Sequence, residues 1–163
     1  EFPNRLSVTL DEFQPVAQWG FEGDGKFLSV EGAVFEVNAD DVDSETLPLL
    51  KGPESQAKTV LEMYKFLKPM MAKMDMSLDK LELSQRGSWT AQLASGATLE
   101  LGHGTKQEIS DRLQLFFKTL TQVASRYGRT VTSLLSADLR YDNGYALRLR
   151  GVSTVVPDGL KKP

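Results

Sequence analysis

The side chain best suited to acid–base chemistry in this sequence is His103, the single histidine among 163 residues. It lies between Gly102 and Gly104, where we expect a loop from a strand into a helix. An imidazole in such a loop could act as a general base. One histidine cannot form a histidine-rich zinc site, and a chain without cysteine has no thiolate nucleophile. We therefore favour a turn residue, and predict no metal and no cofactor.

Two further patterns resemble ligand sites only superficially. Residues 102–106 place glycines before a helix start, but match neither the P-loop nor the dinucleotide-binding pattern. We interpret Thr105 and Glu108 there as a helix-capping box. Residues 38–46 are acidic, but lack the alternating carboxylates and central glycine of a calcium loop. No pair of carboxylates has a spacing that supports glycosidase chemistry.

The composition narrows the class of protein. Charged residues make up 25% of the chain and the net charge is −3, with no basic stripe, which argues against nucleic-acid binding. No apolar run approaches the roughly 18 residues that a membrane helix needs. The absence of cysteine excludes a disulfide scaffold.

Two amphipathic helices are predicted from apolar residues spaced three and four apart. The first begins near Pro53, and its stripe consists of Val60, Leu61, Tyr64, Leu67, Met71 and Met74. The second begins after Thr105 and ends at Gly128, with a stripe of Ile109, Leu113, Phe116, Leu120, Val123 and Tyr127. All five methionines lie between Met63 and Met76, and we favour core filling over an adaptable docking surface.

Alternating apolar residues predict the strands. We expect a small meander at residues 17–19, 26–30 and 33–37, a short apolar segment at 47–50, and an antiparallel run at 78–85, 88–93 and 98–101. Residues 6–10 also alternate but have no upstream partner, so we interpret residues 1–15 as the end of a preceding domain. The fold class is α+β, an antiparallel β-sheet with two helices packed on one face and a C-terminal β-hairpin at the sheet edge.

That hairpin spans residues 134–150. A three-residue loop of Asp142, Asn143 and Gly144 would set Tyr141 opposite Tyr145, and Asp138 would meet Arg148. Residues 151–159 contain proline and glycine and look too broken to form another long strand. We therefore predict that residues 145–150 form the sheet edge, open to a partner's strand and only partly guarded by its arginines. The alternative is a solvated edge that binds nothing.

Six groups of residues, in order, resemble the periplasmic part of the bacterial FtsQ family of cell division proteins. They are Pro15-Val16-Ala17-Gln18-Trp19, Leu47-Pro48 with Gly52-Pro53-Glu54, Ser88-Trp89, Leu99-Glu100-Leu101-Gly102, Arg112-Leu113, and Asp138-Leu139-Arg140-Tyr141-Asp142-Asn143-Gly144.

The resemblance implies a non-enzymatic divisome scaffold that recruits the FtsB–FtsL complex. Residues 1–15 would be the last strand of a truncated POTRA domain, residues 16–152 the β domain, and residues 153–163 a C-terminal tail. The protein would be a single-pass inner-membrane protein with this part in the periplasm, at the division septum. Its anchor would lie outside this sequence.

The resemblance also implies a partner-binding site at the closing hairpin. The turn residues are Arg140, Tyr141, Asn143 and Gly144, and Arg86 is a further basic contact. FtsB would add a strand to a receiving strand made of Tyr145, Ala146, Leu147, Arg148 and Leu149.

Three positions depart from the family pattern. Asn143 stands where some members have serine, and Leu149 where some have an aromatic residue. Gly87 replaces the second of two basic residues that often precede Ser-Trp, so Arg86 would have to substitute for it. Two rival hypotheses are a periplasmic cell-wall hydrolase using His103, and a module that self-associates through the same edge.

Overall fold

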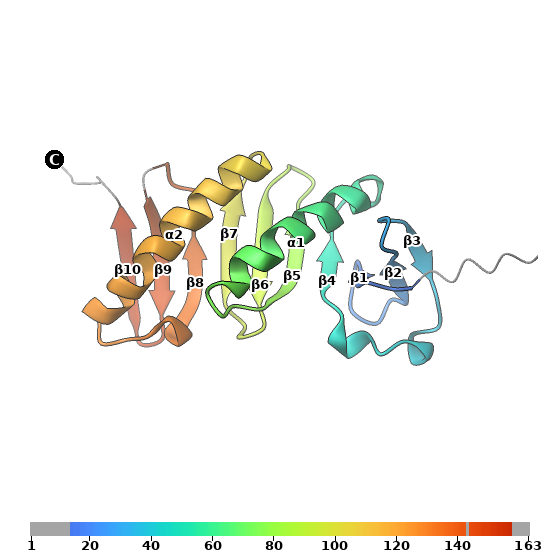
Figure 1. The fold of residues 1–163 in the computed structure, drawn as a ribbon, viewed down its shortest axis with the longest axis horizontal. Coiled ribbons are helices and arrows are strands. Elements are labelled where there is room, and N and C mark those ends of the chain that lie inside the picture. The colour runs from blue at the N-terminus through green and yellow to red at the C-terminus, as the bar shows by residue number, and fades with distance from the viewer. Residues whose placement is uncertain (1–13, 143, 158–163) are drawn as a thin grey trace, which may run out of the picture.

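The computed structural model describes residues 14–142 and 144–157, and within them ten strands form one sheet with two helices on one face (Figure 1). Along the sheet the strand order is β10-β9-β8-β7-β6-β5-β4-β1-β2-β3. The expected opening strand at residues 6–10 lies outside the described residues.

The element bounds follow the expected segments closely. The strands are β1 (Ala17–Trp19), β2 (Lys26–Leu28), β3 (Val34–Glu36), β4 (Leu49–Lys51), β5 (Leu78–Leu83), β6 (Trp89–Leu93), β7 (Thr98–Gly102), β8 (Leu134–Asp138), β9 (Gly144–Leu149) and β10 (Val152–Pro157). The helices are α1 (Ala57–Ala72) and α2 (Lys106–Arg126). Short 3₁₀ turns are η1 (Ala39–Asp41), η2 (Ser44–Thr46), η3 (Glu54–Gln56) and η4 (Val131–Ser133).

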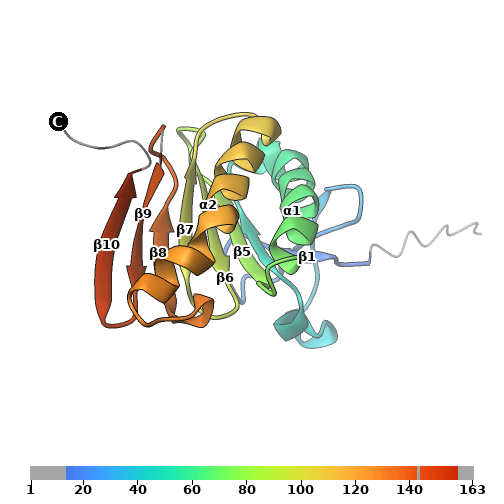
Figure 2. The same ribbon diagram turned by 60° about the vertical axis from the view of Figure 1, so that its left-hand side comes forward.

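The α+β class and the placement of both helices on one face are confirmed, but the sheet is mixed rather than antiparallel. Strand β4 pairs in parallel with β1 and β5, and β7 pairs in parallel with β8. The reason is the connections: α1 joins β4 to β5, and α2 joins β7 to β8 (Figure 2). A strand that crosses back over the sheet through a helix enters from the same end, so its neighbour runs parallel.

The first helix buries the predicted stripe except Met74, which was wrongly included because it follows the last helical residue, Ala72, and is only partly buried. Its fully buried members are Val60, Leu61, Leu67 and Met71, with Tyr64 8% exposed. The five methionines divide into two groups. Met63, Met71 and Met76 are buried in the core, as predicted, whereas Met70 and Met74 are only partly buried.

The second helix begins with the predicted capping box. The Thr105 hydroxyl accepts from the Glu108 amide at 3.2 Å, and the Glu108 carboxylate accepts from the Thr105 amide at 2.7 Å. The stripe from Ile109 to Val123 is buried. Tyr127 was wrongly included, because it follows the last helical residue and is 44% exposed. Gly128 ends the helix with φ +65°, as predicted.

The two faces of the sheet differ in polarity. Alternate residues of β5, β6 and β7, including Leu81, Ala91 and Leu99, are buried beneath the helices. Between them stand polar residues such as Thr90 and Glu100, whose side chains are hydrogen-bonded at 2.9 Å. Among the described residues, neither helix is long and apolar enough to cross a bilayer.

The capping box predicts a measurable loss of stability. Thr105→Ala removes the acceptor for the Glu108 amide and should lower the free energy of unfolding by about 1 kcal/mol. The matched control is Thr121→Ala, an exposed threonine inside the same helix, where alanine should be neutral or slightly stabilising. Urea denaturation of both variants measures the difference, and equal stabilities would contradict the capping role.

Candidate functional site

The hairpin of β8 and β9 has a longer connection than predicted. Ala137 pairs with Leu147 and Asp138 with Ala146, so the register differs by two residues from the predicted one. A shift of two residues keeps each side chain on its face, because the side-chain period of a strand is two. The predicted pairs of Tyr141 with Tyr145 and of Asp138 with Arg148 are therefore wrong.

Local hydrogen bonds explain the longer connection. The Leu139 amide donates to the Glu100 carbonyl at 2.8 Å, so the chain stays beside β7 after β8 ends. Arg140 then folds back onto Asp138: its Nε donates to Oδ1 at 2.8 Å and its Nη2 to Oδ2 at 2.6 Å. This bidentate pair replaces the expected cross-strand pair.

The Asp138–Arg140 pair has an electrostatic signature. Hydrogen bonds from the Arg140 side chain lower the pKa of the Asp138 carboxyl below its usual value, and the same bonds raise the pKa of Arg140. The Arg140 side chain is 57% exposed. A partner would therefore meet a charged group whose orientation is already set.

Gly102 at the end of β7 makes room for Arg140. Its φ is +81°, and a Cβ there would lie 2.9 Å from the Arg140 Cγ. Arg112 of α2 holds the same corner, because its Nη1 donates to the Leu101 carbonyl at 2.9 Å and the His103 carbonyl at 2.5 Å. The β7–α2 loop is thus fastened from both sides.

His103 makes a contact that joins two loops. Its Nε2 lies 3.0 Å from the Arg86 carbonyl oxygen, which links the β7–α2 loop to the β5–β6 turn. Gly87 in that turn has φ +86°, a backbone conformation that disfavours side chains, and a Cβ there would lie 3.7 Å from the His103 ring. The positive φ therefore accounts for glycine at this position of the turn. Arg86 is exposed at the same corner.

Tyr145 belongs to the core. Its ring meets Phe116 edge-on, with the ring centroids 5.1 Å apart, and it is 2% exposed. Its hydroxyl is hydrogen-bonded to Thr119, and burial raises its pKa. Tyr141, in contrast, is 47% exposed. Of the two tyrosines, only Tyr141 offers its ring to a partner.

The side chains of the rest of β9 alternate between the buried and the exposed face of the sheet. Leu147 and Leu149 are buried on the α2 side, so Leu149 cannot serve as a hydrophobic anchor for a partner. Ala146 is half-buried and Arg148 exposed on the opposite face. A partner of β9 could therefore reach its backbone and the side chains of these two residues.

The prediction that β9 forms the sheet edge is wrong. Strand β10 pairs with it antiparallel along its whole length, from Val152 opposite Leu149 to Pro157 opposite Gly144. The edge strand is β10, which the sheet order places at the end of the sheet (Figures 1 and 2). Asn143, expected in the binding turn, lies outside the described residues.

The sequence did contain a signal for β10. Residues 152–156, Val-Ser-Thr-Val-Val, are rich in β-branched side chains, which favour strands. Arg150 and Gly151 form a two-residue connection, with Gly151 at φ +81°. The glycine and proline interpreted as strand breakers lie at the two ends of this run rather than inside it.

The structure thus brings three predicted contacts to one corner and leaves others elsewhere. Arg86 and Arg140 both contact the β7–α2 loop, and Tyr141 follows Arg140 in the chain. The alternate side chains of β9 point into the core. Among residues 14–142 and 144–157, no cluster of three or more histidine or acidic residues could hold a metal ion.

Comparison with known proteins points to one family. The chain matches the family model for cell division protein FtsQ/DivIB, C-terminal, over residues 17–140. It is 35% identical over 152 residues to cell division protein FtsQ of Burkholderia pseudomallei, covering 93% of this chain and 58% of that protein. It is 31% identical over 147 residues to cell division protein FtsQ of Escherichia coli, covering 90% of this chain and 51% of that protein. The chain spans little more than half the length of these relatives.

The Asp138–Arg140 pair can be tested by titration. Arg140→Ala should raise the pKa of Asp138 towards its usual value of about 3.9, because the two donors are lost. The matched control Arg148→Ala should leave it low. The carbon-13 chemical shift of the Asp138 carboxyl group, measured as a function of pH, gives the pKa in each variant. Since the folded pKa is lowered, the pair stabilises the fold above the unfolded pKa, and this stabilisation is lost as pH falls through the folded pKa. If the pKa of Asp138 rose only in the Arg148→Ala variant, Asp138 would be paired with Arg148 across the hairpin, and the pairing with Arg140 would be wrong.

Proposed function

Because the chain belongs to the FtsQ/DivIB family of cell division proteins, we propose that it is a non-enzymatic divisome scaffold that recruits the FtsB–FtsL complex. FtsB would bind at the corner formed by Arg86, Arg140 and Tyr141 and pair its backbone with β9. One observation about β9 carries this proposal. Its apolar side chains are buried against α2, while its outer backbone edge pairs with a single terminal strand, β10.

The proposal includes the placement of the whole protein. Residues 16–152 form the β domain, and residues 1–15 are the end of a POTRA domain. The protein is anchored in the inner membrane by a single span outside this sequence, with this part in the periplasm at the septum. The tail expected from residue 153 is shorter than the sequence suggested, because β10 extends to Pro157.

Because β10 occupies the outer edge of β9, a strand of FtsB would have to replace β10 in order to pair with β9. Strand β9 is held by β8 and by its side chains against α2, whereas β10 pairs with β9 alone. A partner strand could therefore replace β10 while β8 and α2 still hold β9; Val152, which packs against the core at the start of β10, would be released in the exchange. Backbone hydrogen bonds lost with β10 are made again with the partner, as in other cases of strand addition.

An exchange needs contacts beyond the backbone. A tethered strand competes at a high effective concentration, in the millimolar range for short linkers. The incoming strand must therefore gain affinity elsewhere. Tyr141 and Arg140 supply an aromatic ring and a cation beside the first residue of β9, Gly144, and Arg86 supplies a second cation in the β5–β6 turn. An acidic residue of the partner would suit this corner.

The rival functions receive less support. His103 contacts a backbone carbonyl, and its role in joining two loops accounts for it without catalysis. Self-association would have to pair the β10 edges of two copies of the chain. The molar mass measured in solution would then increase with protein concentration. Neither rival explains the exposed Tyr141 beside Arg140.

Tyr141→Ala tests the aromatic anchor. Loss of an anchor of this type should cost at least about 2 kcal/mol of binding to a synthetic peptide of the periplasmic segment of FtsB, or about thirtyfold in Kd. The matched control is Tyr127→Ala, a tyrosine of similar exposure at the end of α2. Calorimetric titration gives both affinities, and equal values for the two variants would remove Tyr141 from the site.

A reversible lock tests the exchange of β10. Ala146 and Val155 lie opposite each other in the ladder, so Ala146→Cys with Val155→Cys should form a cross-strand disulfide. The oxidised protein should bind the FtsB peptide at least tenfold more weakly than the reduced protein, because β10 can no longer leave. The parent chain has no cysteine, so reductant should not change its affinity.

The opposite result has a clear meaning. If the oxidised and reduced forms bind equally, provided that the disulfide is verified by mass, the partner does not replace β10. Binding would then take place at the outer edge of β10 or elsewhere, and the proposed exchange would be wrong.

A further inference from the structure

Helices α1 and α2 are neighbours on the same face of the sheet, and a groove lies at the seam between them. Helix α1 packs on β4 and β5, and α2 packs on β7 and β9. The two helices also contact each other, and the β6 residues beneath them, Trp89, Ala91 and Leu93, are buried. Along the outer side of this helix–helix seam runs a groove of about 420 Å³, lined by residues of both helices. This interhelical groove is lined chiefly by Phe66, Met70, Lys73, Met74, Phe117 and Lys118.

The floor of the interhelical groove is apolar and adaptable. Phe66, Met70, Met74 and Phe117 are only partly buried, although they pack against the core. Methionine adjusts to differently shaped partners, because its side chain is unbranched and polarisable. The two methionines that the core does not absorb are thus found together at this surface.

The rim of the groove is positively charged. Lys73 and Lys118 line it, and no acidic residue does. The Nζ of Lys106 lies 5.9 Å from the centre of the Phe66 ring, so a third cation stands at the α2 start. Among nearby carboxylates, Asp111 accepts a hydrogen bond from Gln107. A cationic rim in a chain of net charge −3 favours an acidic occupant.

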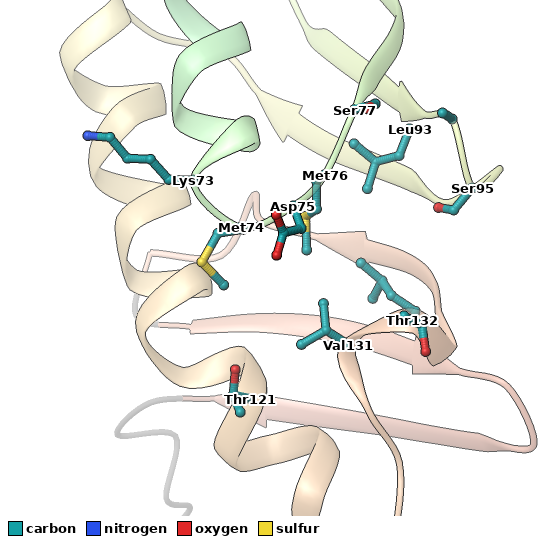
Figure 3. A pocket seen from close by; sticks show the side chains of 12 residues that line it. Lys73, Met74, Asp75, Met76, Ser77, Leu93, Ser95, Thr121, Val131 and Thr132 are labelled. Carbon is teal, nitrogen blue, oxygen red and sulfur yellow. The ribbon is translucent and has the colours of Figure 1, made fainter.

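The groove continues into a second hollow. This hollow, of about 530 Å³, lies beyond the end of α1 and shares Lys73 and Met74 with the groove. Figure 3 shows Met74 and Val131 facing this hollow, while the Lys73 side chain extends away from it on the α2 side. The two hollows adjoin at Lys73 and Met74, and Asp75 lines the second one, so the cationic rim belongs to the interhelical groove alone.

We infer that the interhelical groove is a second docking site, separate from β9, for an amphipathic helix of a partner protein with an apolar face and acidic flanks. Such a helix would place its apolar side chains on Met70, Met74 and the two phenylalanines, as in other helix-in-groove complexes. Its carboxylates would meet Lys73 and Lys118. The site is independent of the strand exchange on β9.

A peptide selection tests this inference on the 163-residue chain. The probe is a phage-displayed library of 18-residue helical peptides with a constant leucine face and flanking positions varied among Glu, Gln and Lys. Selection should enrich Glu over Lys. The best peptide should bind the Lys73→Glu, Lys118→Glu variant at least tenfold more weakly. The control with the same net charge, Lys58→Glu with Lys68→Glu on α1, should bind as the parent does.

Methionine methyl NMR locates the contact. The peptide should shift the methyl signals of Met70 and Met74 and leave that of buried Met63 unchanged. The inference is wrong if no peptide is enriched, if the groove variant binds normally, or if Met70 and Met74 do not respond. It is also wrong if these two signals respond only to phosphatidylglycerol vesicles or to rising protein concentration, since the occupant would then be a lipid surface or a second copy.

Discussion

The contact between Tyr145 of β9 and Phe116 of α2 holds the closing strands to the rest of the domain. The rings meet edge-on and the Tyr145 hydroxyl bonds to Thr119, so a buried polar group is satisfied where the strand meets the helix. Leu147 and Leu149 continue this buried face. Because one face of β9 is fully used in this way and its outer backbone edge is paired with β10, another polypeptide could reach that edge only by displacing β10.

The corner around Gly102 shows how a residue suited to catalysis can serve as a structural link. His103 joins the β7–α2 loop to the β5–β6 turn, and Arg112 holds the same loop through two carbonyls. Arg140 lies against Gly102, where any side chain would collide with it. This corner fixes the charged side chains of Arg112 and Arg140 against the end of β7.

Two surfaces for protein partners arise from the same topology. The two strand-helix-strand connections place α1 and α2 side by side on one face of the sheet, and the interhelical groove runs along their seam. The sheet also ends in β10, a terminal strand that pairs with β9 alone. One proposed surface offers side chains and charge, and the other offers a backbone ladder, so different partners would use them.

The amino-acid sequence by itself determined the helices with their capping box, most of the core stripe, the strand positions from β1 to β9 and the family motifs. These features depend on residues a few positions apart, whose spacing alone decides which face is buried. Tertiary structure decided the strand directions, the partner of Asp138 and the occupant of the outer edge of β9. In each case distant segments compete for the same hydrogen-bonding groups: Arg140 rather than Arg148 pairs with Asp138, and β10 takes the ladder that the sequence had left open.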